Sequence, residues 1–114
     1  MSNNRNRRPT HPGAILREDI LPELGLTQAQ LAGLLNVSRR TVSEILKERR
    51  SVTTNMAQRL ARAFGTTPEF WLRLQQAVDI WQTRKMRKEE YERIRPISTA
   101  RRSKLTGSAN SKAA

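Results

Sequence analysis

The chain of 114 residues is short, strongly basic and free of cysteine. Its 22 Lys and Arg residues against 10 Asp and Glu residues give a formal net charge of +12, which points to a polyanionic partner, either nucleic acid or an anionic membrane surface. The length allows one domain with tails. The lack of cysteine excludes disulfides and thiolate metal sites. No apolar run approaches the ~18 residues that a membrane-spanning helix needs. We therefore expect a cytoplasmic protein.

The positive charge is concentrated at the two ends. Residues 1–10 carry a net charge of +3, residues 11–83 only +2, and residues 84–114 +7. The two ends are polar as well as basic, and such segments cannot bury enough apolar surface to fold. We expect a disordered basic arm over residues 1–10, a folded domain over residues 11–95, and a disordered basic tail over residues 96–114.

The first two helical patterns are short, and each has its own start signal. The first is expected over Pro12–Leu21, because proline suits a first helical turn, and Pro22 is expected to end it. The second is expected over residues 28–35, because Thr27 and Gln30 have the spacing of a capping box.

A three-residue turn separates the second helix from a third, which we expect over Arg39–Glu48. Asn36 tolerates the left-handed conformation that ends a helix, and Ser38 is a good N-cap for the next one. Small or aliphatic residues occupy the positions that would bury the inner faces of both helices: Leu31, Ala32, Leu35, Val37, Val42 and Ile45. Two short helices joined in this way resemble the helix-turn-helix of DNA-binding repressors.

A fourth helix follows Thr53 or Thr54 and ends at Gly65, and a fifth begins at Pro68. Apolar residues recur at helical spacing in the fifth helix and predict its inner face: Phe70, Leu74, Ala77, Val78 and Trp81. We expect this helix to fray within residues 82–92, and Arg95-Pro96 is its natural end, because the residue before a proline avoids the helical region. The predicted fold is all-α, a compact five-helix domain with a helix-turn-helix and flexible basic tails at both ends.

The third predicted helix has a polar face opposite its apolar one, and a helix of this width fits the major groove of DNA. We expect Arg39 and Arg40 to contact guanine or phosphate, and Glu44 to accept a hydrogen bond from cytosine. Flanking side chains suit phosphate contacts. The predicted DNA-binding residues are Gln28, Ser38, Arg39, Arg40, Thr41, Ser43, Glu44, Lys47, Arg49 and Arg50.

A single helix-turn-helix contacts only a few base pairs, so useful specificity requires a homodimer on two half-sites. We expect Trp71, Leu72 and Trp81 to form the dimer interface, because they project partly off the apolar stripe of the fifth helix and exposed apolar patches mark interaction sites.

The sequence offers no catalytic constellation and no glycine-rich phosphate loop, so we do not expect an enzyme or a cofactor. The single histidine, His11, has no second metal ligand near it, so we expect no metal site and place His11 in a loop or at a helix cap. Arg59, Arg62 and Arg73 are expected on solvated faces.

Beyond the helix-turn-helix, residues 11–81 resemble the HigA-type, or VapI-type, antitoxins of bacterial toxin–antitoxin modules. The resemblance is carried by HPGAILREDIL (residues 11–21), LGLTQAQLAGLLNVSRRTVSEIL (24–46), RRSVTTNMAQRLARAFGTTPEFWLRLQ (49–75) and AVDIW (77–81). It implies a five-helix repressor domain that binds a palindromic operator in its own promoter as a homodimer. It also implies a partner toxin of the HigB type, typically a RelE-like mRNA endonuclease.

The chain departs from this family pattern at one point. Lys47-Glu48 stands where the family usually has Asn-Gly, so the left-handed exit that glycine permits is not expected here. We therefore expect the recognition helix to run about one turn longer.

A toxin that holds RNA is itself basic, so a basic antitoxin cannot bind it by overall charge attraction. It needs a local acidic or apolar patch. Glu18, Asp19 and Glu23 lie close together in the first helix and its exit, and they form the predicted toxin-binding patch. The alternative is that these three residues are ordinary surface acids.

Two other interpretations stay open. A stand-alone helix-turn-helix regulator without a toxin would have the same fold. An RNA-binding or membrane-surface protein is disfavoured, because the chain has only five aromatic residues and no strand pattern, and residues 84–95 lack an apolar stripe. The leading prediction is an autorepressor and antitoxin located on the nucleoid, with double-stranded DNA, a second copy and a toxin as partners and no membrane.

Overall fold

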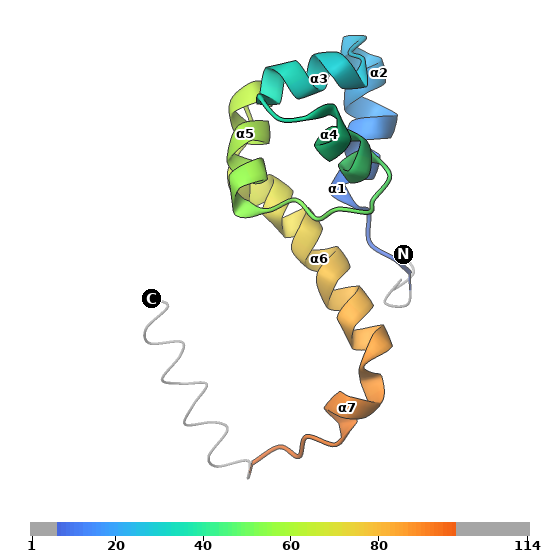
Figure 1. The fold of residues 1–114 in the computed structure, drawn as a ribbon. Helices are drawn as coiled ribbons and strands as arrows, with labels where there is room; N and C mark the ends of the chain where they lie inside the picture. The colour runs from blue at the N-terminus through green and yellow to red at the C-terminus, as the bar shows by residue number, and fades with distance from the viewer. Residues whose placement is uncertain (1–6, 98–114) are drawn as a thin grey trace, which may run out of the picture. The chain divides into compact units, whose positions relative to one another are not determined.

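Residues 7–97 are described by the computed structural model, so residues 1–6 of the predicted arm and residues 98–114 of the predicted tail lie outside the described part. The chain divides into two compact units between residues 83 and 84. The first unit holds α1 (Pro12–Ile15), the π-helical turn η1 (Leu16–Ile20), α2 (Leu21–Leu24), α3 (Gln28–Leu35), α4 (Arg39–Leu46), α5 (Thr54–Phe64) and most of α6 (Pro68–Met86) (Figure 1). Within the described residues the predicted all-α fold with a helix-turn-helix is confirmed.

The first helical segment is continuous from α1 through η1 to α2, so the prediction that Pro22 ends it is wrong. Inside a regular α-helix, proline lacks an N–H donor and its ring clashes with the carbonyl four residues back. Here the preceding turn is π-helical, and Leu21 donates its N–H to Leu16 O, five residues back. This wider turn accommodates Pro22, and the helix continues to Leu24 before Gly25 ends it with φ 64°.

The helix starts around the helix-turn-helix follow the predicted side-chain caps. The Gln30 N–H donates to Thr27 Oγ1 at 3.1 Å, and the Thr27 N–H donates to Gln30 Oε1 at 2.9 Å, which completes the capping box. The Thr41 N–H donates to Ser38 Oγ at 3.0 Å and caps α4. These bonds satisfy N–H groups that have no partner within the helix, so local sequence sets both starts.

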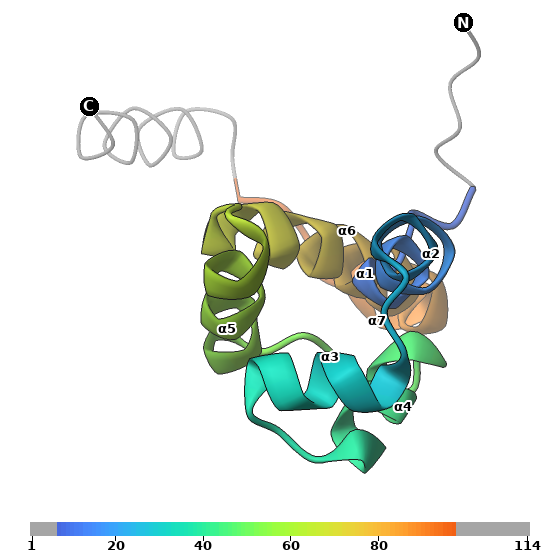
Figure 2. The ribbon, with the colours of Figure 1, turned by 90° about the horizontal axis from the view of Figure 1, so that it is seen from above.

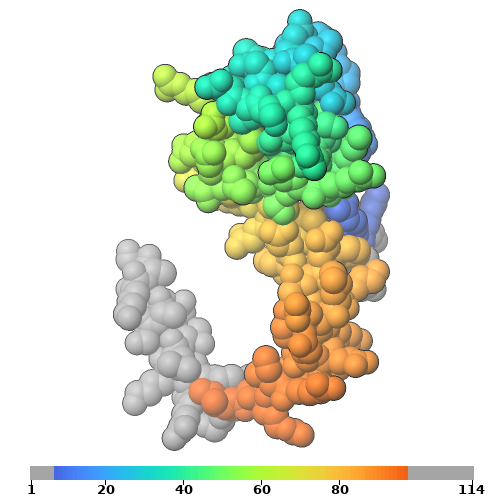
Figure 3. All heavy atoms as spheres, viewed as in Figure 1, coloured from blue at the N-terminus to red at the C-terminus, as the bar shows by residue number. Residues whose placement is uncertain are grey.

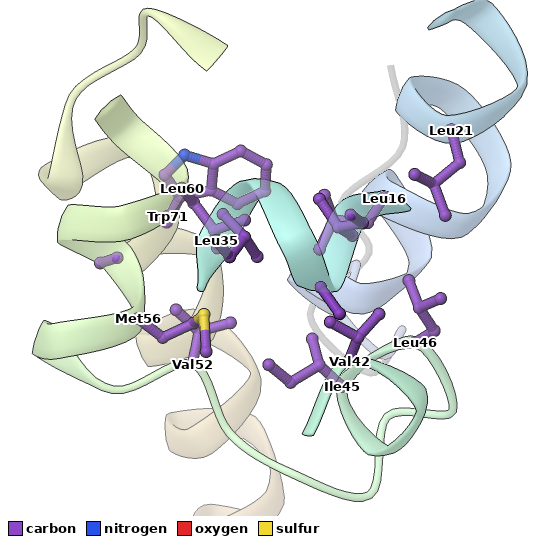
Figure 4. Packing of buried hydrophobic residues seen from close by; sticks show 13 residues of the cluster. Leu16, Leu21, Leu35, Val42, Ile45, Leu46, Val52, Met56, Leu60 and Trp71 are labelled. Atoms are coloured by element: carbon purple, nitrogen blue, oxygen red, sulfur yellow. The ribbon is translucent and has the colours of Figure 1, made fainter. Parts of the chain in front are cut away.

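The core of the first unit is formed by residues of η1, α2, α3, α4, α5 and the start of α6, together with Val52 of the loop before α5 (Figure 4). Seen from above, α5 lies on one side of this unit and α1 and α2 on the other, and α3 crosses between them (Figure 2). Each large aliphatic side chain buried here contributes about 1.5–3 kcal/mol of transfer free energy. The buried cluster consists of Leu16, Leu21, Leu31, Ala32, Leu35, Val42, Ile45, Leu46, Val52, Met56, Ala57, Leu60 and Trp71.

The buried face of α6 is one residue out of phase with the prediction. Trp71 is completely buried, and Gln75 and Val78 follow it toward the core, whereas Phe70 is 42% exposed. The indole N–H of Trp71 donates to Thr66 Oγ1 at 2.8 Å, so the ring is satisfied inside its own domain. The prediction that Trp71 lies at a dimer interface is therefore wrong.

The second unit contains the end of α6 and the short helix α7 (Lys88–Glu92). α6 stops at Met86, within the residues 82–92 where the fifth helix is predicted to fray, and α7 ends at Glu92, before Arg95-Pro96. The described side chains of this unit are all exposed, and ion pairs join Arg87 to Glu90 at 2.8 Å and Lys88 to Glu92 at 3.9 Å. Across residues 7–97, none of the helices has the length and apolar character needed to cross a bilayer.

Candidate nucleic-acid interface

The polar face of α4 lies at the surface, as the sequence predicts. Val42, Ile45 and Leu46 are buried in the core, whereas the side chain of Arg40 is 85% exposed. In the space-filling view, side chains of α3 and α4 cover one continuous part of this face (cyan to green in Figure 3). All ten predicted DNA-binding residues are accessible: Gln28, Ser38, Arg39, Arg40, Lys47, Arg49 and Arg50 are exposed, and Thr41, Ser43 and Glu44 are half-buried.

The turn between α3 and α4 is fixed by its backbone geometry. Asn36 has the predicted left-handed conformation, with φ 58° and ψ 48°. The Val37 N–H donates to Ala32 O at 3.0 Å, and the Asn36 N–H donates to Gly33 O at 3.2 Å. This is the Schellman pattern, in which the last carbonyls of a helix are satisfied by the residues that leave it. Because Ser38 caps the next helix at once, the turn leaves little freedom between α3 and α4.

Arg59, on α5, binds the end of α3, so the prediction of a solvated position is wrong. The residue is half-buried, and its Nη1 donates to the carbonyl oxygens of Leu35 at 2.9 Å and Asn36 at 3.4 Å. Carbonyls at a helix C-terminus lack partners within the helix and carry partial negative charge, which favours a nearby cation. The contact arises because α5 packs against α3, which no local sequence pattern reveals.

The recognition helix α4 packs closely against α1 on the side opposite its exposed polar face. A Cβ atom added to Gly13 would overlap the carbonyl oxygen of Ile45, so only glycine permits this packing distance. His11 precedes it as the N-cap of α1, and the Gly13 N–H donates to its Nδ1 at 2.9 Å. The predicted cap position of His11 is thus confirmed, and its burial lowers the pKa of the imidazole below 6.5.

The recognition helix ends at Leu46, and the prediction that it runs to Glu48 is wrong. Glu48 adopts a left-handed conformation with φ 63°, although that conformation costs a residue other than glycine about 1–2 kcal/mol. The Glu48 N–H donates to Ile45 O at 2.9 Å, and the Arg49 N–H donates to Glu44 O at 2.8 Å. The tight exit expected of the family pattern is therefore made without its glycine.

The side chain of Glu48 is bound on both sides by arginine. Arg8 Nη1 donates to it at 2.7 Å and Arg17 Nη1 at 3.2 Å, and Arg17 Nη1 also donates to Leu46 O at 2.6 Å. Partial burial raises the pKa of Glu48, but the hydrogen bonds from the two arginines outweigh it, and the pKa lies below its usual range. These contacts hold the exit of α4, and sequence reasoning missed both arginines because their partners lie more than 28 residues away.

Glu44 lies between two arginines of the exposed face. Arg40 Nε donates to its Oε2 at 3.1 Å, and Arg50 donates to its Oε1 through Nε at 2.9 Å and Nη2 at 2.6 Å. Hydrogen bonds from Arg50 first, and then from Arg40, hold the pKa of Glu44 below its usual value. The carboxylate therefore stays ionised and links the helix to the loop that follows it.

The acidic residues of the predicted toxin-binding patch, Glu18, Asp19 and Glu23, are all exposed. Arg17 Nη2 donates to Glu18 at 2.7 Å, so one of the three carboxylates is already paired. Leu24, 55% exposed, adds an apolar side chain to the same short segment. Within residues 7–97, no group of three or more His, Cys, Asp or Glu side chains is arranged to hold a metal ion.

The two remaining residues of the predicted dimer interface differ from Trp71. Leu72 and Trp81 are half-buried, and Leu72 packs partly against the core of its own chain. Phe70 lies at 5.1 Å from Trp71, ring centroid to ring centroid, and is more exposed than the prediction allowed.

Comparison with known proteins places this geometry among regulators and antitoxins. A helix-turn-helix family model matches residues 16–71. The HTH-type transcriptional regulator YbaQ of Escherichia coli K12 is 47% identical over 94 residues, which cover 81% of this chain and 83% of that protein. Antitoxin HigA-1 of Vibrio cholerae is 41% identical over 91 residues, which cover 80% of this chain and 86% of the antitoxin.

A solved structure extends the likeness to three dimensions. The structure of the Pseudomonas aeruginosa antitoxin HigA with the higBA promoter has a TM-score of 0.76 to this chain and 37% identity, and the match covers 80% of this chain and 100% of that one. With a recognition helix held in this way and such identity over about four fifths of its length, the chain belongs to the XRE-like helix-turn-helix family that includes the HigA antitoxins, and it is not an enzyme.

Proposed function

We propose that this protein is a sequence-specific DNA-binding autorepressor that serves as the antitoxin of a type II toxin–antitoxin module. The observation that carries DNA binding is α4, a short helix with an exposed cationic face that is fixed at its start by Ser38 and at its exit by Glu48 and Arg17. A rigid helix of this kind presents its side chains to the major groove without first having to order itself.

In the proposed complex, the two ends of α4 have different tasks. Arg39 and Arg40, in its first turn, contact base edges, while Arg49 and Arg50 in the following loop contact phosphates. The related P. aeruginosa antitoxin was solved with promoter DNA, which supports a duplex as the partner here.

The DNA-binding proposal is tested with Arg40→Ala. The preferred site is first selected from a library of random duplexes, and affinity is then measured by fluorescence anisotropy. We expect Arg40→Ala to weaken binding to that site by about 1–3 kcal/mol. Arg73→Ala removes the same charge from an exposed position on α6 and should leave the preference unchanged. If Arg40→Ala binds the selected site as tightly as the unaltered protein, α4 does not read it.

We further propose that two copies bind a palindromic operator as a homodimer. Four apolar residues follow one another along α6 at i, i+4, i+7 and i+11, beside its buried face: Phe70, Leu74, Ala77 and Trp81. Phe70 and Ala77 are exposed, and the other two are half-buried. We call this row the α6 stripe and propose that it contacts the second copy, because it is an apolar surface that is partly exposed to solvent. A dimer doubles the number of base pairs contacted, because it brings two recognition helices to the DNA.

For the antitoxin role, we propose that a HigB-like toxin with a RelE-like endonuclease fold binds at Glu18, Asp19 and Glu23. Support comes from the exposure of these carboxylates on a chain that is otherwise basic, and from the identity to antitoxin HigA-1. An acidic patch can pair with the basic side chains that an RNA-cleaving toxin needs for its own substrate.

A co-expression growth assay tests the toxin contact. Glu18→Lys combined with Asp19→Lys should abolish rescue of cells that express the toxin encoded next to this gene. Glu69→Lys combined with Glu89→Lys reverses two exposed carboxylates elsewhere and should rescue as well as the unaltered protein. Full rescue by the first pair would move the toxin contact to another surface.

A stand-alone transcription regulator is the second candidate function. It is favoured by the 47% identity to YbaQ, which is named an uncharacterized HTH-type transcriptional regulator. In that case the unaltered protein would rescue cells from no neighbouring toxin while still binding its operator. Under either function the protein would reside on the nucleoid, where its operator lies.

A further inference from the structure

Glu44 is a carboxylate at the centre of a surface that is otherwise suited to a polyanion. Its side chain is 27% exposed and belongs to α4, on the same face as Arg40. A free carboxylate in the major groove would lie close to two phosphate backbones, which repel it. Its presence on this face therefore calls for a role that uses the negative charge.

The acceptor capacity of Glu44 is largely occupied within the protein itself. An ionised carboxylate offers about four acceptor sites. Three N–H groups already fill most of them: Arg40 Nε at 3.1 Å on one oxygen, and Arg50 Nε and Nη2 at 2.9 and 2.6 Å on the other. Glu44 is thus engaged with protein donors and has little capacity left to accept a hydrogen bond from cytosine.

The contact with Arg40 uses the guanidinium edge that base recognition does not need. Arg40 donates to Glu44 through Nε at 3.1 Å, and the hydrogen bond between the two side chains does not use the two terminal nitrogens. Those two nitrogens form the fork that pairs with O6 and N7 of guanine. The carboxylate therefore restrains a long, 85% exposed side chain while leaving its recognition edge open.

We propose that Glu44 is a positioning and specificity-determining residue, which holds Arg40 for guanine and Arg50 for the adjacent phosphate rather than reading a base itself. The proposal rests on the proposed function of sequence-specific DNA binding. Glu44 acts in two ways: it orders the two arginines before DNA arrives, and its charge repels phosphates when the helix is not seated on its correct site.

Removal of the carboxylate should therefore weaken specificity rather than simply weaken binding. With Glu44→Ala, Arg40 loses its restraint, so we expect the preference for guanine at the position that Arg40 contacts to fall about two- to five-fold, the scale of an exposed ion pair. The freed arginines can reach phosphates anywhere along a duplex, so affinity for random DNA should rise several-fold. The slope of log K against log salt should steepen by about one.

The experiment uses the full chain and the site selected from random duplexes, with the guanine position replaced by each other base. Glu44→Ala, Arg40→Ala and the double variant are compared by anisotropy at several salt concentrations. If Glu44 acts through Arg40, the double variant should show the same base preference as Arg40→Ala alone. Glu44→Gln keeps one acceptor oxygen and should recover part of the preference.

Glu69→Ala is the matched control, because it removes one exposed negative charge from α6 and should leave the guanine preference intact. Circular dichroism verifies that each variant keeps its helices. The proposal is overturned if Glu44→Ala leaves the guanine preference unchanged, or if it relaxes a preference for cytosine at another position, since Glu44 would then read that base directly. A protein that selects no preferred site at all would instead refute sequence-specific binding, and the role of Glu44 would fall with it.

Discussion

His11 is a titratable side chain that serves as a helix cap while it is only 3% exposed. Because Nδ1 accepts the Gly13 N–H, the neutral ring carries its proton on Nε2. Protonation of Nδ1 would remove that acceptor and place a charge in the interior. Burial lowers the pKa of His11, and the nearby Glu48 only partly opposes it.

The free energy of unfolding should therefore depend on pH through His11. The unfolded chain takes up a proton near pH 6.5, whereas the folded chain does so only at lower pH. The contribution of His11 is thus fully present above pH 6.5 and is lost as the pH falls below that value toward the folded pKa. Urea unfolding at pH 7.5 and 5.5 should show this loss.

His11→Asn is the matched variant for this prediction, because asparagine is a good N-cap and does not titrate. It should flatten the difference in unfolding free energy between pH 7.5 and 5.5. Hydrogen bonds from arginine hold the pKa of Glu44 and that of Glu48 below the usual value of a glutamate, so neither carboxylate takes up a proton between pH 7.5 and 5.5. An equal loss of stability in His11→Asn would assign the pH dependence to another group.

At the scale of helices, the packing of α1 on α4 depends on one missing side chain. Gly13→Ala would place a methyl group against the Ile45 carbonyl, and two backbones would have to separate to admit it. We expect a loss of about 1–3 kcal/mol in unfolding free energy. Gly33→Ala, in α3, meets nothing within 4 Å and should stabilise the protein by about 0.5–1 kcal/mol. Thermal unfolding of both variants compares the two sites directly, and equal effects would contradict the close approach.

Sequence predicted the helix starts and the end of α3, whose causes are local, although it misplaced the ends of the first helical segment and of α4. The capping box at Thr27 and the left-handed Asn36 depend on residues within a few positions, and both are confirmed. The phase of α6 was missed because the polar Gln75 occupies a buried position. Its amide accepts from the Val52 N–H and donates to Asp79, both at 2.8 Å. The spacing of apolar residues cannot predict that a polar residue is buried when its hydrogen-bond partner lies 23 residues away.

The exposed face of α4 was predicted for the same local reason, since the helical spacing of its apolar and polar residues can be recognised within its eight residues. The arginines that hold the ends of α3 and α4 were not predicted. Arg17 donates to Leu46 O at the end of α4 and Arg59 to Leu35 O at the end of α3, and such contacts exist only once the helices have packed. In a chain with many basic residues, the sequence does not distinguish an arginine that binds a backbone carbonyl from one that is exposed to solvent.

At the scale of the whole molecule, the α6 stripe predicts the state of association. Ala77 is exposed on that stripe, so Ala77→Glu adds a charge there without disturbing the core. We expect the unaltered protein to be dimeric at micromolar concentration and this variant to be monomeric, because a buried charge without a partner is costly. Light scattering after size exclusion measures the mass.

Gln76→Glu introduces the same charge at the adjacent exposed position, off the stripe, and should leave the dimer intact. If Ala77→Glu remains a dimer, the second copy binds elsewhere on the chain. If both variants dissociate, net charge rather than the stripe controls association.

The π-helical turn Leu16–Ile20 also sets the rotational phase of the residues after it. Leu16 and Leu21 are five positions apart and both buried, a spacing that would put them on different sides of a regular α-helix, where each residue advances by about 100°. The turn thus acts as a one-residue insertion that the helix has absorbed. The π turn therefore determines which residues after it face the core. The same inserted residue that returns Leu21 to the core leaves Glu18 and Asp19 exposed to water.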